Sequence, residues 1–116
     1  MELTSLPIDV FMSRNTSLGQ HVDFYFAGDS TDALPILLAA LPAGAEVSAS
    51  APENSDGEVM ARRTQDGFEI RRRCRGVNNT WRQSSMLEAI NWLLPGIKWS
   101  ESRYKGGQCT LWLPHQ

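Results

Sequence analysis

Residues 58–75 read EVMARRTQDGFEIRRRCR, and this stretch decides the fold because it encodes a β-hairpin. Asp66-Gly67 is the strongest short turn signal when it lies between two runs that alternate apolar and polar side chains. We therefore predict strands at Glu58–Thr64 and Phe68–Arg75. Since a hairpin must pair with more chain before it is stable in water, the rest of the sequence is expected to supply further strands.

The two faces of this predicted hairpin differ in character. A two-residue turn would place Arg62 opposite Arg71, and Met60 opposite Arg73, on one face, where only Glu69 offsets the like charges. The other face is apolar and is expected to point toward the core; it carries Val59, Ala61, Phe68, Ile70 and Cys74.

The same signals divide the remaining chain into strands and helices. Further strands are predicted at Ile8–Arg14, at Gln20–Ala27, at Ala45–Ala51, from Ile97 onward, and at Gln108–Leu113. Helices are predicted at Thr31–Leu41, with its cap in Gly28-Asp29-Ser30, and from Asn79 or Thr80 to Leu94, where Pro95-Gly96 would stop the helix.

This order gives a definite fold class. We expect one α+β domain over residues 1–116, with an antiparallel sheet of about six to seven strands and two helices packed on one face. Residues 1–52 and 58–116 each follow the order strand, strand, helix, strand, which suggests a duplicated unit. Because a helix followed by Pro and Gly and then a strand is common, coincidence is an equal alternative.

Charge is distributed unevenly along the chain. Residues 1–58 carry one basic and nine acidic side chains (1 − 9 = −8), and residues 59–116 carry ten basic and four acidic (10 − 4 = +6), which sum to the net −2. Eight of the nine arginines and all four tryptophans lie at or after Arg62. Arg and Trp are the side chains that most often anchor macromolecular interfaces.

The candidate binding residues follow from this enrichment. A row of Arg62, Arg71 and Arg73 on one hairpin face calls for an anion supplied from outside, because a guanidinium binds carboxylate or phosphate oxygens. The alternative is internal neutralisation by the acidic half of the chain. Its candidate carboxylates are Asp23, Glu46 and Glu58.

The four tryptophans complete the candidate set. Trp81 and Trp92 are predicted three turns apart on the polar face of the second helix, as a contact surface, with packing of each ring against neighbouring chain as the alternative. In a C-terminal hairpin closed by Gly106-Gly107, Trp99 and Trp112 would share a face. Glu101 and Arg103 would join them there, and Cys109, Leu111 and Leu113 would lie on the opposite face.

Signals for chemistry and for membranes are weak in this sequence. His21 and His115 stand in no catalytic pattern, no metal-ligand spacing occurs, and no cofactor fingerprint is present, so we expect neither an enzyme nor a metal or cofactor site. We predict no membrane segment and no export signal. Cys74 and Cys109 are then expected to be reduced thiols in a cytoplasmic protein.

Three functions fit these observations. The first is a small non-catalytic protein-binding module, an inhibitor or immunity-type protein of bacterial or phage origin that blocks a working surface of another protein, such as a nuclease toxin. The second is nucleic-acid binding through the arginine-rich sheet face, against which the low pI of about 5.6 counts. The third is self-association as a homodimer, in which the acidic half of one copy meets the basic half of another.

Overall fold

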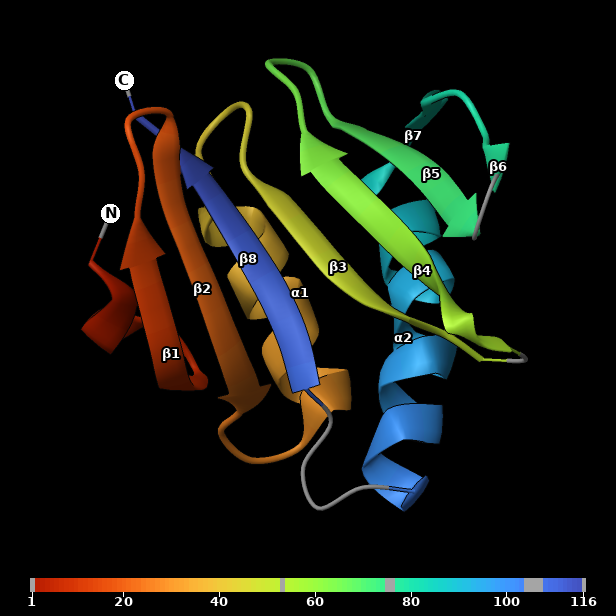
Figure 1. Cartoon of the computed structure of the whole chain (residues 1–116), viewed down its shortest axis with the longest axis horizontal. Coiled ribbons are helices and arrows are strands. Elements are labelled where there is room, and N and C mark those ends of the chain that lie inside the picture. The colour runs from red at the N-terminus through yellow and green to blue at the C-terminus, as the bar shows by residue number, and fades with distance from the viewer. Residues whose placement is uncertain (1, 53, 75–76, 104–107, 116) are drawn as a thin grey trace.

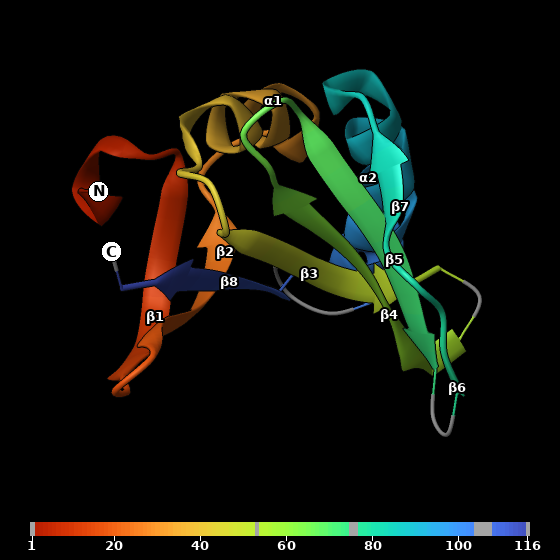
Figure 2. The same cartoon turned by 90° about the horizontal axis from the view of Figure 1, so that it is seen from above.

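The computed structural model describes residues 2–52, 54–74, 77–103 and 108–115, and its strands form one antiparallel sheet (Figure 1). The elements in chain order are a 3-10 turn η1 (Leu3–Ser5), β1 (Ile8–Asn15), β2 (Gly19–Phe26), α1 (Ser30–Ala40), β3 (Glu46–Ala51), β4 (Asn54–Arg63), β5 (Phe68–Cys74), β6 (Val77–Asn78), β7 (Arg82–Ser84), α2 (Met86–Arg103) and β8 (Gln108–Pro114). The predicted α+β class is confirmed, as is the packing of both helices on one face of the sheet (Figure 2).

The order of strands mixes the two halves of the chain. Across the described part of the sheet it is β1-β2-β8-β3-β4-β5-β6, with the short β7 also on β5. The last strand, β8, therefore lies between β2 and β3, although it carries no charged side chain itself. Charge that is segregated along the sequence is brought together where Glu46 pairs with Arg62 and Glu58 pairs with Arg73. The predicted duplication stays a prediction.

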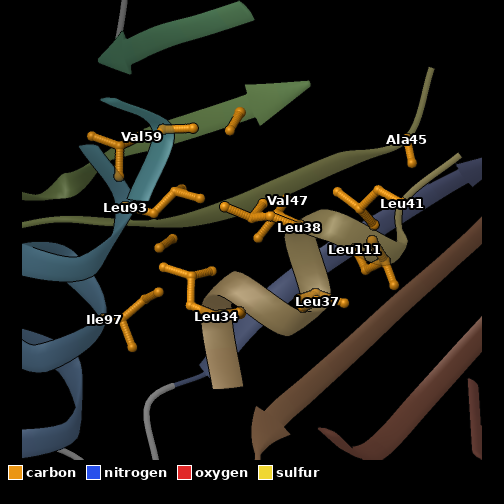
Figure 3. Close-up of a cluster of buried hydrophobic side chains, with 14 of the residues drawn as sticks. Leu34, Leu37, Leu38, Leu41, Ala45, Val47, Val59, Leu93, Ile97 and Leu111 are labelled. Carbon is orange, nitrogen blue, oxygen red and sulfur yellow. The ribbon is translucent and has the colours of Figure 1, made fainter. Parts of the chain in front are cut away.

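The core lies between the helices and one face of the sheet (Figure 3). Strand residues alternate between buried and half-buried, as in β3, so one face is packed and the other is left without helices. The packed residues are fully or almost fully buried and include Leu34, Leu37, Leu38, Val47, Val59, Leu93, Ile97 and Leu111. Because side chains alternate along each strand, burial of one set against the helices places the other set on the opposite face of the sheet.

The register of the central hairpin differs from the prediction by two residues. Arg63 pairs with Phe68, and Arg62 pairs with Glu69, so the connection is a four-residue turn rather than Asp66-Gly67 alone. The hydroxyl of Thr64 explains the difference, because its Oγ1 accepts a hydrogen bond (3.0 Å) from the N–H of Gly67. A shift of two residues keeps every side chain on its predicted face and changes only the partner across the strand.

The second helix starts later than predicted. Thr80 and Gln83 do not form a capping box, because Arg82–Ser84 are the strand β7 and pair with the outer edge of β5. The box is formed instead by Ser85, whose Oγ accepts from the N–H of Glu88 (3.1 Å), while the Glu88 carboxylate accepts from the N–H of Ser85 (3.3 Å). Residues 82–84, which could otherwise start the helix, thus pair as a strand with the edge of β5 that β4 leaves open.

The second helix also ends later than predicted. It continues through Pro95-Gly96 to Arg103, so the strand predicted from Ile97 is wrong, and the C-terminal hairpin built on that strand is wrong with it. The Gly106-Gly107 turn lies outside the described residues. Asn91, whose carbonyl loses its helical partner to Pro95, is exposed and can bond water instead. Ile97 is fully buried on the helical stripe that it shares with Leu93.

One surface ion pair connects the two helices at their ends. Asp29 caps α1 by accepting from the N–H of Thr31 (2.8 Å), and Lys98 of α2 donates to the same Oδ1 (3.0 Å). These bonds, from the Thr31 backbone first and from Lys98 second, lower the pKa of Asp29 below its ordinary value. The predicted cap for α1 is therefore also a link between helices.

Candidate functional site

The face of the sheet opposite the helices, called here the open face, gathers most of the predicted site residues. Strand register places them in rows that cross the whole sheet. One row runs Arg14, His21, Trp112, Glu46, Arg62, Glu69, and the next runs Met12, Asp23, Thr110, Ser48, Met60, Arg71. The flanking pair Glu58 and Arg73 belongs to the same face.

The middle of the open face is hollowed. Viewed from above, the sheet bends so that β1 and the β5–β6 side extend away from the helices (Figure 2). A hollow of about 300 Å³ lies between its central strands. It is lined by His21, Glu46, Ser48, Glu58, Met60, Arg73, Thr110 and Trp112.

Beside the hollow, two arginine side chains lie over the ring of Trp81. The Cζ atom of Arg62 lies 4.1 Å from the centroid of the indole ring, and that of Arg71 lies 4.6 Å from it. Trp81 comes from the segment between β6 and β7, which the edge of β5 holds in place. We call Trp81, Arg62, Arg71, Met60 and Glu69 the Trp81 cluster. Trp81 is half-buried, so part of this residue remains accessible to a ligand.

Two of the three predicted arginines have carboxylate partners within the protein. Arg62 donates from Nε (3.1 Å) and Nη2 (2.8 Å) to one oxygen of Glu69, directly across the strands. Arg73 forms an ion pair with Glu58, its neighbour in register. The predicted like-charge opposition of Arg62 and Arg71 is therefore wrong, because the two-residue change of register puts Glu69 opposite Arg62 and Met60 opposite Arg71. Neutralisation by the acidic half of the chain accounts for Arg73 through Glu58, whereas Arg62 pairs with Glu69 of its own hairpin.

Arg71 differs from the other two arginines. Its Nη2 contacts the Sδ atom of Met60 (3.6 Å), and its Cζ atom lies over the ring of Trp81. No carboxylate of the described chain pairs with it, and its buried Nε atom has no acceptor there. Among the three predicted arginines, Arg71 is therefore the one left to pair with a carboxylate supplied from outside.

The other predicted tryptophans are separated by the fold. Trp92 lies on α2, on the helix side of the sheet, and donates from Nε1 to the carbonyl of Arg71 (3.3 Å), so it serves packing. Trp99 also lies on α2, next to Arg103, whose Cζ is 5.2 Å from its ring. The predicted pairing of Trp81 with Trp92, and of Trp99 with Trp112, is wrong because both pairings relied on incorrect helix boundaries. Trp81 and Trp112 remain on the open face.

Sequence reasoning missed several aromatic and apolar groups at the other end of this face. Phe11 of β1 stacks on Tyr25 of β2, with ring centroids 4.7 Å apart. Met12 is 60% exposed next to them. The alternation of His21, Asp23 and Tyr25 along β2 was the available signal for Tyr25. A β-bulge between Val10 and Met12 places Phe11 there, and no short pattern marks such a bulge.

The described residues offer few groups for catalysis or metal binding. No three His, Cys, Asp or Glu side chains within residues 2–52, 54–74, 77–103 and 108–115 stand where they could hold a metal ion. Burial raises the pKa of the Cys109 thiol to about 12, so it stays protonated at neutral pH and is a poor nucleophile. Asp23 accepts a hydrogen bond from Thr110 (3.1 Å). What the open face offers chemically is ion pairs, aromatic rings and the guanidinium of Arg71, which pairs with no carboxylate of the described chain.

Comparison of the chain with protein-family models, with curated proteins and with solved structures finds no significant match. None of the helices in the described ranges combines the length and apolar character that crossing a lipid bilayer requires.

Proposed function

We propose that this chain is a non-catalytic protein-binding module that uses its open face, with the Trp81 cluster as the anchor. The observation that carries the proposal is the placement of Arg62 and Arg71 over one half-buried indole, on a face that no helix covers. Trp and Arg held in a rigid arrangement supply most of the binding energy in many interfaces. Their conformational entropy is already reduced before a partner arrives.

The partner is proposed to present carboxylates to Arg71. No carboxylate of the described chain pairs with this guanidinium, and its planar fork fits an Asp or Glu side chain. The hollow beside it, which Trp112 and Met60 line, would take an apolar side chain of the same partner. A charged contact next to an apolar pocket is the usual composition of an interface centre.

An inhibitor or immunity-type role is our more specific proposal. A protein of 116 residues that binds through one rigid face can block a partner's working surface without chemistry of its own. The presence of both charge signs on the open face indicates a partner with a mixed surface rather than a purely basic groove. We propose a bacterial or phage origin and a location in the bacterial cytoplasm, which the free thiols of Cys74 and Cys109 support.

Nucleic-acid binding is the alternative class and is less well supported by this arrangement. Arg62 and Arg73 are already paired with Glu69 and Glu58, and Glu46 and Asp23 lie in the same rows. A phosphate backbone would meet these carboxylates at the same time as the arginines. Since nonspecific affinity for nucleic acid comes mainly from unpaired cations, an evenly mixed face is a poor electrostatic match.

The experiment that separates these classes uses matched variants of the purified, immobilised chain. Trp81→Ala and Arg71→Ala remove the anchor, and Leu87→Ala and Arg103→Ala remove exposed groups of α2 on the other side of the molecule. A protein ligand should be retained from cell extract by the wild type and by both α2 variants. Its retention should fall at least about 30-fold with either anchor variant, the loss typical of a central interface residue.

A titration with nucleic acid tests the alternative directly. Mixed short DNA and RNA are added to the wild type at low and high salt while Trp emission is followed. No saturable change is expected at either salt concentration. Saturable binding that weakens steeply with salt and is lost in Arg71→Ala would replace the protein-binding proposal with nucleic-acid binding.

A further inference from the structure

The two edges of the sheet are covered differently. Beyond β5 the edge is taken by β6 and β7, whereas within the described chain β1 pairs with β2 alone. β1 has eight residues, and all of them after Ile8 are exposed. A long strand with one unpaired row of N–H and C=O groups is a template for a further strand.

The centre of this edge is apolar. Val10, Phe11 and Met12 are 41%, 45% and 60% exposed. Edge strands usually carry Lys, Pro, inward charges or a bulge that hinders pairing with another chain. β1 has neither Lys nor Pro, and it has one bulge, between Val10 and Met12. The charged residues of β1, Asp9 and Arg14, flank the apolar centre on either side.

We propose that β1 pairs antiparallel with β1 of a second copy, about a two-fold axis that passes between Phe11 and Met12. In this register Asp9 of each copy lies opposite Arg14 of the other, so two ion pairs flank the axis. Phe11 of one copy meets Met12 of the other at the centre. The proposed partner strand is β1 of a second copy. Asp9 and Arg14 carry opposite charges and lie equally far from the centre of β1, so an antiparallel copy of the same strand matches both charges.

The backbone of β1 has the hydrogen-bonding phase that this register needs. The carbonyl of Pro7 accepts from Ala27 (3.0 Å), and the N–H of Thr16 donates to Gly19 (2.8 Å), so these two groups point toward β2. In an antiparallel strand, the backbone N–H and C=O groups of successive residues point alternately to one neighbouring strand and to the other. The backbone groups of Val10 and of Ser13, on either side of the bulge, therefore point away from β2. The proposed register places Val10 opposite Ser13 of the second copy, where both can bond.

The side chains also lie on the correct face. Asp9 is across from Tyr25, and Arg14 is across from His21, which places both charges on the open face. A register moved by two residues would keep the backbone phase but set Asp9 against Met12 and lose both ion pairs. The dimer would join the open faces of two copies into one continuous surface, which goes beyond the binding function proposed above.

The test is a charge swap measured by sedimentation equilibrium over concentrations up to about 1 mM, since an interface of one strand per copy is small and weak. The wild type should show a monomer–dimer equilibrium. Asp9→Arg and Arg14→Asp each turn two ion pairs into like-charge contacts and should weaken dimerisation about tenfold or more. The double variant Asp9→Arg/Arg14→Asp restores opposite charges and should return the dissociation constant to near the wild-type value.

Control measurements separate this edge from other surfaces. Asp66→Arg reverses a charge in the exposed β4–β5 turn and should leave the equilibrium unchanged. Amide exchange at Ser13 should slow as the concentration rises. A monomeric wild type at 1 mM, single variants that dimerise like the wild type, or a double variant as weak as the singles would each overturn the proposal.

Discussion

Gly96 of α2 lies against the backbone carbonyl of Ser50 in β3, so closely that a Cβ atom at residue 96 would stand 1.9 Å from that oxygen. Real side chains do not approach an oxygen at that distance, so the contact requires glycine. It brings the middle of α2 directly onto the sheet and buries Leu93 and Ile97 on either side. The glycine is part of the helix–sheet packing and does not end the helix.

Replacing Gly96 by Ala is expected to destabilise the fold by about 1–3 kcal/mol, the cost of forcing extra volume into a packed contact. Helix propensity alone predicts the opposite sign, a gain of up to about 1 kcal/mol. Urea unfolding measures the free energy directly. Asn91→Ala, at an exposed position of the same helix, is the control and should be neutral or slightly stabilising. A Gly96→Ala protein as stable as the wild type would contradict the close contact.

Both ends of α2 differ from the predicted ends for one physical reason. Pro95-Gly96 is normally a stop signal, and Thr80 and Gln83 normally form a capping box, because both patterns reflect the local chain. Here tertiary contacts determine where α2 begins and ends. Arg82–Ser84 pair with β5 as an edge strand, and Gly96 packs closely against β3 without ending the helix. The strands of the first half were predicted well, since alternation along β2 and β3 reports directly on burial.

Ser85 and Glu88 should determine where α2 begins. Ser85→Ala removes the acceptor for the N–H of Glu88 and is expected to cost about 1 kcal/mol of folding free energy. Thr80→Ala changes the cap that the sequence pattern favours and should have little effect. Chemical denaturation of the two variants side by side distinguishes them, and a larger loss in Thr80→Ala would move the helix start back toward Thr80.

Cys109 should make stability depend on alkaline pH. Burial raises its pKa to about 12 from the ordinary 9.0, so the folded state holds the proton more tightly than the unfolded state. The contribution is complete below pH 9 and is lost as pH rises toward 12, by about 1 kcal/mol at pH 10. Comparing wild type with Cys109→Ala across this range isolates the thiol. The stability difference between the two proteins should change with pH, and a constant difference would show that the thiol is not buried.

Asp29 should make stability depend on acidic pH. Its pKa is lowered in the folded state by the Thr31 N–H and by Lys98, so its contribution is present above the ordinary value of 3.8. That contribution is lost as pH falls through the lowered pKa. Asn at residue 29 keeps a capping oxygen but has no charge. Asp29→Asn should therefore lose less stability on acidification than the wild type, and equal acid sensitivity of the two proteins would contradict the ion pair.

The candidate site was predictable in part for similar reasons. Even with the wrong register, the face of Arg62, Arg71 and Arg73 was correct, because a shift of two residues preserves alternation. Trp81 could not be placed beside Arg62 from the sequence, because their contact depends on how the segment between β6 and β7 returns along β5. The pairing of Arg73 with Glu58 likewise required the four-residue turn.

We propose that the open face is the protein-binding surface. The most direct test places a photo-crosslinking amino acid at Ser48, which lines the hollow, and compares it with the same group at exposed Leu87 on α2. In cell extract, residue 48 should give a discrete protein adduct that Arg71→Ala suppresses, and residue 87 should give none. An adduct from residue 87 alone, or one at residue 48 that persists in Arg71→Ala, would contradict the assignment of the partner to the Trp81 cluster.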